Sequence, residues 1–155
     1  MLEQYLTDTA DQDAMFYSDD NTLNFTHERT YSLAYLGDDY ISVVADGYDD
    51  NPTAAHANSY RLGYVYDRHS GERVYLADIL PTGYEDRIQS SVVARIAAAG
   101  EADSYYPGYA DQIKAVLAEE NWYIKDDTLY VIFNPYRIAP PALGILEFPY
   151  NYLAG

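Results

Sequence analysis

The feature that most constrains the fold of this chain is a hydrophobic periodicity that changes twice along the sequence. Residues 29–48 and 60–66 carry apolar or aromatic side chains at alternate positions, which is typical of β-strands. Residues 84–99 and 109–120 instead repeat apolar residues every three or four positions, as amphipathic helices do. Residues 122–133 then return to extended patterning. This order contains no βαβ rhythm, so we predict an α+β fold: a mainly antiparallel sheet with two consecutive helices inserted between strand regions.

Turn-forming residues bound the expected strands. Residues 37–39 and 125–128 each predict a tight turn within a β-hairpin. Residues 72–76 are expected to be extended as well. A last strand is expected over residues 145–148, ended by Pro149, because proline cannot donate a ladder hydrogen bond.

The first predicted helix carries signals at both of its ends. Thr82 is a candidate N-cap, with Glu85 at the third helical position, as in a capping box. Gly100 is the expected stop, because glycine readily adopts the left-handed conformation that ends many helices.

The length of 155 residues is that of one ordinary domain. We assign residues 29–155 to a single α+β domain and residues 1–28 to a helical or irregular N-terminal segment. The start of the chain shows no basic stretch followed by an apolar core, so no signal peptide is visible. Two interpretations stay open: a cytoplasmic protein, or an excised or truncated piece of a longer exported one.

Charge narrows the classes of partner. The chain carries 25 acidic residues against nine basic ones, a formal net charge of −16. Such a field repels phosphate backbones and anionic lipid, so we expect no nucleic-acid partner and no membrane contact by this fragment. The negative charge favours a cationic partner, or it serves only to keep the protein soluble.

No known catalytic motif occurs in the sequence. There is no cysteine, no nucleophilic-serine motif and no glycine-rich phosphate loop, and His27, His56 and His69 are not spaced as metal ligands. Four acidic pairs suggest calcium, but none fits the twelve-residue calcium loop, and we expect all of them in turns: Asp19-Asp20, Asp38-Asp39, Asp49-Asp50 and Asp126-Asp127. We therefore predict no metal, no cofactor and no enzymatic activity. Two facing carboxylates acting on a glycoside remain an alternative.

Residues 134–144 contain three prolines and cannot form a regular element. A loop this stiff can present side chains at low entropic cost, which suits binding, and makes Tyr136 and Arg137 candidate binding residues. The competing interpretation is that Tyr136 and Ile138 cover the sheet as core. For these two side chains the sequence favours core packing.

Three segments together resemble a known bacterial family. They are Ala54-Ala-His-Ala-Asn58 with Tyr64-Val-Tyr-Asp67, then Val74-Tyr-Leu-Ala-Asp78-Ile-Leu80, and finally Trp122-Tyr-Ile124 with Leu129–Pro140 and Phe148-Pro-Tyr150. The chain resembles, over roughly residues 29–153, the domain of unknown function that forms the extracellular part of the lysozyme-sensing anti-sigma factor of Bacillus-type bacteria. Similar domains precede the catalytic module of some peptidoglycan deacetylases. The resemblance also implies that residues 1–28 are the remnant of a companion domain that usually comes before this one in the family.

The resemblance implies a non-enzymatic binding or sensing module, outside the cell or in the envelope of a Gram-positive bacterium. Its ligand would be a cationic protein such as lysozyme, or a cell-wall glycan such as peptidoglycan. An accessory role beside a deacetylase is the alternative. The resemblance and the loop positions together give His56, Tyr136 and Arg137 as candidate binding residues. Around His56 the family usually carries glycines where this chain has alanines, which predicts a different loop shape here.

Overall fold

The computed structural model describes residues 25–152. Its elements in chain order are β1 (Thr26–Leu36), β2 (Tyr40–Asp50), β3 (Asn58–Asp67), α2 (Leu76–Ile79), α3 (Tyr84–Ala99), η1 (Ala102–Ser104), α4 (Tyr109–Leu117), β4 (Trp122–Lys125), β5 (Thr128–Phe133), η2 (Pro141–Leu143) and β6 (Leu146–Tyr150). The predicted α+β class is confirmed. The predicted boundary at residue 29 falls within β1, and the rest of the predicted N-terminal segment, residues 1–24, lies outside the described residues.

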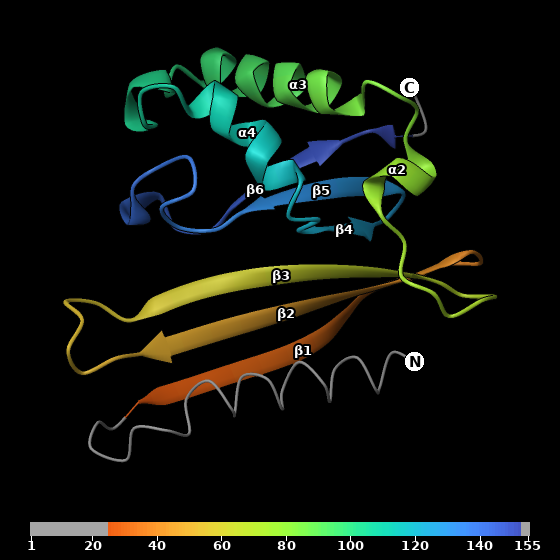
Figure 1. Ribbon diagram of the computed structural model, residues 1–155, viewed down its shortest axis with the longest axis horizontal. Helices are drawn as coiled ribbons and strands as arrows, with labels where there is room; N and C mark the ends of the chain where they lie inside the picture. Colours follow the sequence, from red (N-terminus) through yellow and green to blue (C-terminus); the bar gives the residue numbers. More distant parts are fainter. Residues whose placement is uncertain (1–24, 153–155) are drawn as a thin grey trace.

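The strands form two antiparallel sheets of three strands each, in the orders β1-β2-β3 and β4-β5-β6. Both predicted hairpins are present, and Asp126 and Asp127 both adopt positive φ in the two-residue turn between β4 and β5. The longer helices α3 and α4 lie over the β4-β5-β6 sheet, on the side away from β1-β2-β3 (Figure 1). No helix in the described part of the chain is long and apolar enough to cross a membrane.

The main core lies between the helices and the second sheet. The expected helix stripe is confirmed, since Ile88, Val92 and Ile96 of α3 are all buried. They pack in one cluster with buried residues of α4, of the second sheet and of β3, among them Ile113, Leu117, Trp122, Leu129, Phe133 and Val65. Burial of one face of each element is what holds the layers together.

The first sheet meets β4 at an unusually close approach. A Cβ atom added at Gly63 of β3 would lie 2.2 Å from the backbone oxygen of Trp122. On β2, the Ser42 hydroxyl accepts a hydrogen bond of 2.9 Å from the backbone N–H of Ile124. Only a residue without a side chain allows the two backbones to lie so near each other.

Two predicted element boundaries in the middle of the chain are wrong for local reasons. Residues 72–76 do not continue as a strand: Arg73 forms one isolated bridge, and Leu76 begins the helix α2, whose first turn is capped by Asp78. α3 covers the predicted residues and ends at Gly100 as expected, but Gly83 rather than Thr82 is its N-cap.

Two further boundaries are shifted by tertiary contacts. α4 ends at Leu117 instead of residue 120, because Glu120 takes positive φ and its carboxylate accepts hydrogen bonds from the backbone of Leu76 and the Trp122 indole. β6 continues through Pro149 to Tyr150. It is an edge strand of its sheet, where a missing N–H is tolerated.

Candidate ligand-binding groove

Two loops far apart in the sequence form one groove. The loop between β2 and β3 and the loop that carries η2 lie at the same end of the molecule (Figure 1). Between them is an open groove of about 760 Å³. Its walls are His56, Ala57, Asn58, Ser59, Pro135, Tyr136, Pro141, Ala142, Gly144 and Ile145. The volume is within the range of ligand-binding clefts, about 300–1,000 Å³.

Tyr136 is the most exposed aromatic side chain of the groove, at 58%. It sits at the third position of a turn closed by the hydrogen bond from the Arg137 N–H to the Asn134 carbonyl, 3.2 Å. Pro135 precedes it, and its φ is +69°, the pattern of a type II turn in which that position normally belongs to glycine. A bulky L-residue held in this region carries backbone strain.

The three predicted binding residues are not all brought together. His56 and Tyr136 both line the groove, and the His56 side chain is exposed. Arg137 is not among the lining residues, and its guanidinium forms an ion pair with Glu119 instead. The prediction that Tyr136 and Ile138 both pack as core is right for Ile138, which is fully buried, and wrong for Tyr136.

The groove walls contain no lysine, arginine, aspartate or glutamate side chain. Prolines, alanines and one isoleucine supply apolar surface, and Asn58 and Ser59 supply amide and hydroxyl groups. No Asp or Glu is among the lining residues. Within residues 25–152, no group of three or more His, Asp or Glu side chains is arranged to hold a metal ion.

The acidic pairs are placed only partly as predicted. Asp38-Asp39 and Asp126-Asp127 lie in turns, but Asp49-Asp50 are paired residues of β2, and Asp49 forms an ion pair with His27. The first pair, Asp19-Asp20, lies outside the described residues. Strand pairing of Asp49 opposite His27 explains why this pair does not form a turn.

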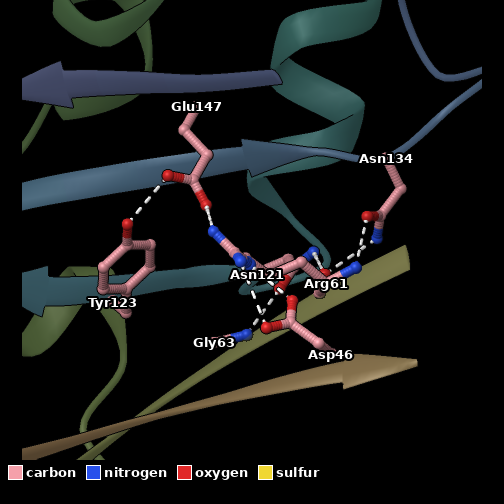
Figure 2. Close-up of polar contacts among 7 residues, drawn as sticks. All are labelled: Asp46, Arg61, Gly63, Asn121, Tyr123, Asn134 and Glu147. Atoms are coloured by element: carbon pink, nitrogen blue, oxygen red, sulfur yellow. Dashed lines mark hydrogen bonds and ion pairs between the residues drawn. The ribbon is translucent and has the colours of Figure 1, made fainter. Parts of the chain in front are cut away.

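A cluster of polar side chains joins the two sheets (Figure 2). The Arg61 guanidinium on β3 donates to both carboxylate oxygens of Asp46 on β2, at 2.7 and 3.1 Å. Its other arm donates to Glu147 on β6 at 2.6 Å. The second oxygen of Glu147 accepts from the Tyr123 hydroxyl on β4 at 2.8 Å. Three strands therefore meet at one guanidinium, and Glu147 links the fourth strand, β4, to it.

Two asparagines pair with the outer edge of β3 as a neighbouring strand would (Figure 2). Asn134 accepts from the Arg61 N–H at 2.8 Å and donates to the Arg61 carbonyl at 3.0 Å. Asn121 accepts from the Gly63 N–H at 2.8 Å and donates to the same carbonyl at 3.0 Å. These bonds satisfy backbone groups that an edge strand would otherwise leave unpaired.

The cluster shifts the acid–base behaviour of two of its members. Hydrogen bonding to Asp46, and further to Glu147, raises the pKa of Arg61 above its usual value, although partial burial opposes this. Burial, followed by the hydrogen bond to Glu147, raises the pKa of Tyr123 well above 10. Arg61 thus stays charged and Tyr123 stays neutral over the physiological pH range.

The other end of the molecule is acidic and rich in tyrosine. The Tyr35 hydroxyl donates to Asp127 at 3.3 Å, from one hairpin to the other. Partial burial, then nearby carboxylates such as Asp39, raises the pKa of Tyr40. The pKa of Tyr152 is raised by burial and then by Asp127. Negative charge from separate turns therefore gathers at this end.

The C-terminal part of the chain is similar to a known family. Residues 77–152 match the family "Protein of unknown function (DUF3298)". The matched segment is just under half of the chain and runs from α2 to the end of β6. It confirms, in this general form, the expected likeness to a domain of unknown function. No curated protein matches the chain.

Two solved structures show the same fold over nearly the whole chain. A DUF3298 family protein from Pseudomonas aeruginosa PAO1 has 20% sequence identity and a TM-score of 0.65, covering 94% of this chain and 67% of that one. A DUF3298 family member from Bacteroides fragilis has 17% identity and a TM-score of 0.68, covering 97% of this chain and 60% of that one. The chain thus spans about two thirds or less of the length of these proteins.

The DUF3298 segment contains one wall of the groove but not the other. Asn134, Tyr136 and Glu147 lie inside it, whereas His56 and Arg61 lie before it. Periodicity could not have found the Arg61 cluster, because its members are 15 to 86 residues apart in the chain. The run Asn134-Pro135-Tyr136 is a local signal for the turn, but it does not indicate that Asn134 bonds to the backbone of β3.

Proposed function

We propose that this chain is a non-enzymatic binding module of the cell envelope whose groove holds a segment of cell-wall glycan. The observation that carries this proposal is the exposed Tyr136 ring, held in a strained turn and lining a groove without Lys, Arg, Asp or Glu side chains. Strain of about 1–3 kcal/mol persists where the surrounding structure enforces it, and such positions concentrate at ligand sites. A tyrosine kept there at a cost to stability points to a role in binding.

The chemistry of the walls supports a carbohydrate. A sugar has an apolar ring face that packs on an aromatic ring, and hydroxyl or acetamido groups that need hydrogen bonds. Tyr136 offers the ring, and Asn58, Ser59 and His56 offer donors and acceptors. The lack of lysine, arginine and carboxylate side chains in the walls favours an uncharged ligand.

The enzymatic alternative gains no support from this site. General acid–base chemistry on a glycoside needs two carboxylates that flank the scissile bond. The groove walls offer none, and Asp46 and Glu147 are both bound to Arg61. In a longer protein the module would report on, or bring a neighbouring domain to, the wall, as the likeness to the anti-sigma factor and deacetylase domains suggests.

A cationic protein such as lysozyme is the second candidate ligand. The net charge of −16 and the acidic turns at the end opposite the groove favour it, because opposite charge accelerates encounter. This contact would use a different surface from the glycan, so the two candidates can be tested in one experiment.

The test is a titration of the protein with N-acetylglucosamine tetramer, and separately with lysozyme at low and high salt. Tyr136→Ala should weaken glycan binding about tenfold, or about 1.4 kcal/mol. Tyr75→Ala removes a comparably exposed tyrosine outside the groove and should leave it unchanged. Equal effects of both substitutions, or no glycan binding by the unaltered protein, would refute the glycan proposal. Lysozyme that fails to bind even at low salt would remove the second candidate.

A further inference from the structure

The groove walls are attached to the polar cluster at three separate points in the sequence. Ser59 is two residues before Arg61 on β3, Pro135 directly follows Asn134, and Ile145 is two residues before Glu147. Each of these wall residues therefore belongs to a different segment: the first segment contains Arg61 itself, and the other two contain Asn134 and Glu147, whose side chains bind to Arg61.

The Asn134 bond has the geometry of a strand pairing rather than of a single contact. Its amide occupies both the N–H and the carbonyl of Arg61, at 2.8 and 3.0 Å, which fixes position and orientation together. The next two residues are Pro135, whose φ is restricted, and Tyr136 in its strained conformation. Few free torsions remain between the clamp and the Tyr136 ring.

We infer that Asn134 is the positioning residue of the groove: by clamping the Arg61 backbone, it sets the distance between the two walls and the direction of the Tyr136 ring. Arg61, pinned by Asp46 and Glu147, provides the fixed point against which Asn134 acts. This inference rests on the proposed binding function of the groove. It adds that ligand affinity depends on a residue that does not line the groove.

Asn121 provides a matched control, because it forms the same two kinds of hydrogen bond to the β3 backbone as Asn134. It donates to the same Arg61 carbonyl at the same 3.0 Å and accepts from a β3 N–H at the same 2.8 Å. Its chain neighbour is the buried Trp122 instead of a groove residue. Asn134→Asp and Asn121→Asp therefore remove the same kind of donor, add the same charge and keep the same side-chain shape.

The experiment compares these two variants in the full chain. Asn134→Asp should weaken binding of N-acetylglucosamine tetramer about tenfold, while Asn121→Asp should change it less than twofold, at a temperature where both are folded. Urea unfolding should show similar losses of stability for both. Equal losses of affinity, or unchanged affinity in Asn134→Asp, would overturn the inference.

A second pair keeps the test decisive if the first variant does not fold. Glu147 lies on the same segment as Ile145, so Glu147→Gln should weaken tetramer binding. Asp46 lies on β2, so Asp46→Asn should affect mainly stability.

If the unaltered protein binds no tetramer, the glycan proposal fails on its own, and the inference about Asn134 is then tested by amide NMR shifts. Asn134→Asp must then shift Ser59 and Ala142 more than Asn121→Asp does, and equal shifts would overturn it.

Discussion

The strain at Tyr136 predicts that the groove is maintained at a cost in stability. Replacing Tyr136 by alanine keeps the positive φ and removes the ring, whereas replacing it by glycine removes both the ring and the steric cost. The difference between the two variants therefore isolates the backbone term, because the lost ring contacts are the same in each.

The expected difference follows from two opposing contributions. An L-residue in the left-handed region costs about 1–2 kcal/mol. Glycine in turn gives the unfolded chain more freedom, which costs about 0.4–1 kcal/mol. Tyr136→Gly should therefore be more stable than Tyr136→Ala by about 0.5–1 kcal/mol. Urea unfolding with a shared slope measures this difference as a shift of the midpoint.

Gly100 provides a reference, within the same protein, for the cost of an L-residue at positive φ. Its φ is +72°, close to the +69° of Tyr136, and a Cβ atom added there meets nothing within 4 Å. Gly100→Ala should therefore lose about the amount by which Tyr136→Gly exceeds Tyr136→Ala. Both Tyr136 variants should lose glycan binding alike. If Gly100→Ala shows its cost while Tyr136→Gly is no more stable than Tyr136→Ala, the turn is not strained and the argument from strain fails.

Two further predictions concern the joint between the sheets. Gly63→Ala should lower the free energy of unfolding by about 3 kcal/mol, because the new Cβ meets the Trp122 backbone oxygen at 2.2 Å. Gly47→Ala should lower it less, because the new Cβ there meets only the Tyr60 ring. Equal urea midpoints for the two variants would contradict this prediction. The pKa of Tyr123 is raised in the folded state, so the unfolded chain binds fewer protons above pH 10, and stability is complete below that pH and falls as pH rises. The proton on Tyr123 changes the free energy of unfolding by up to about 1.4 kcal/mol per pH unit. Urea midpoints between pH 8 and 11 should fall less steeply in Tyr123→Phe, and equal slopes would refute the assignment.

The strained backbone of Tyr136 and the hydrogen bonds from Asn134 to the Arg61 backbone belong to one arrangement. A strained turn keeps its conformation only if both of its ends are held. Asn134 at its start is fixed to β3, and the Tyr136 N–H bonds to the Ala139 carbonyl, next to the buried Ile138. A pre-formed groove of this kind binds with little loss of conformational freedom, which is the advantage expected of a recognition module.

Elements whose signals are local could be predicted from the sequence. Alternation placed β1 to β5, the apolar stripe of Ile88, Val92 and Ile96 gave the length of α3, and Gly100 marked its end. Each of these signals depends on side chains within one or two turns or strand repeats, so periodicity contains the information.

Features that depend on a partner far away in the chain could not be predicted from local sequence. Glu120 ends α4 early because its carboxylate reaches Leu76, and Tyr136 is exposed while Ile138 is buried because Asn134 fixes their turn on β3. The meeting of His56 and Tyr136 in one groove has the same origin. Nothing within either loop specifies the other; the hydrogen bonds that bring them together connect residues more than seventy positions apart, and no local pattern records such a pairing.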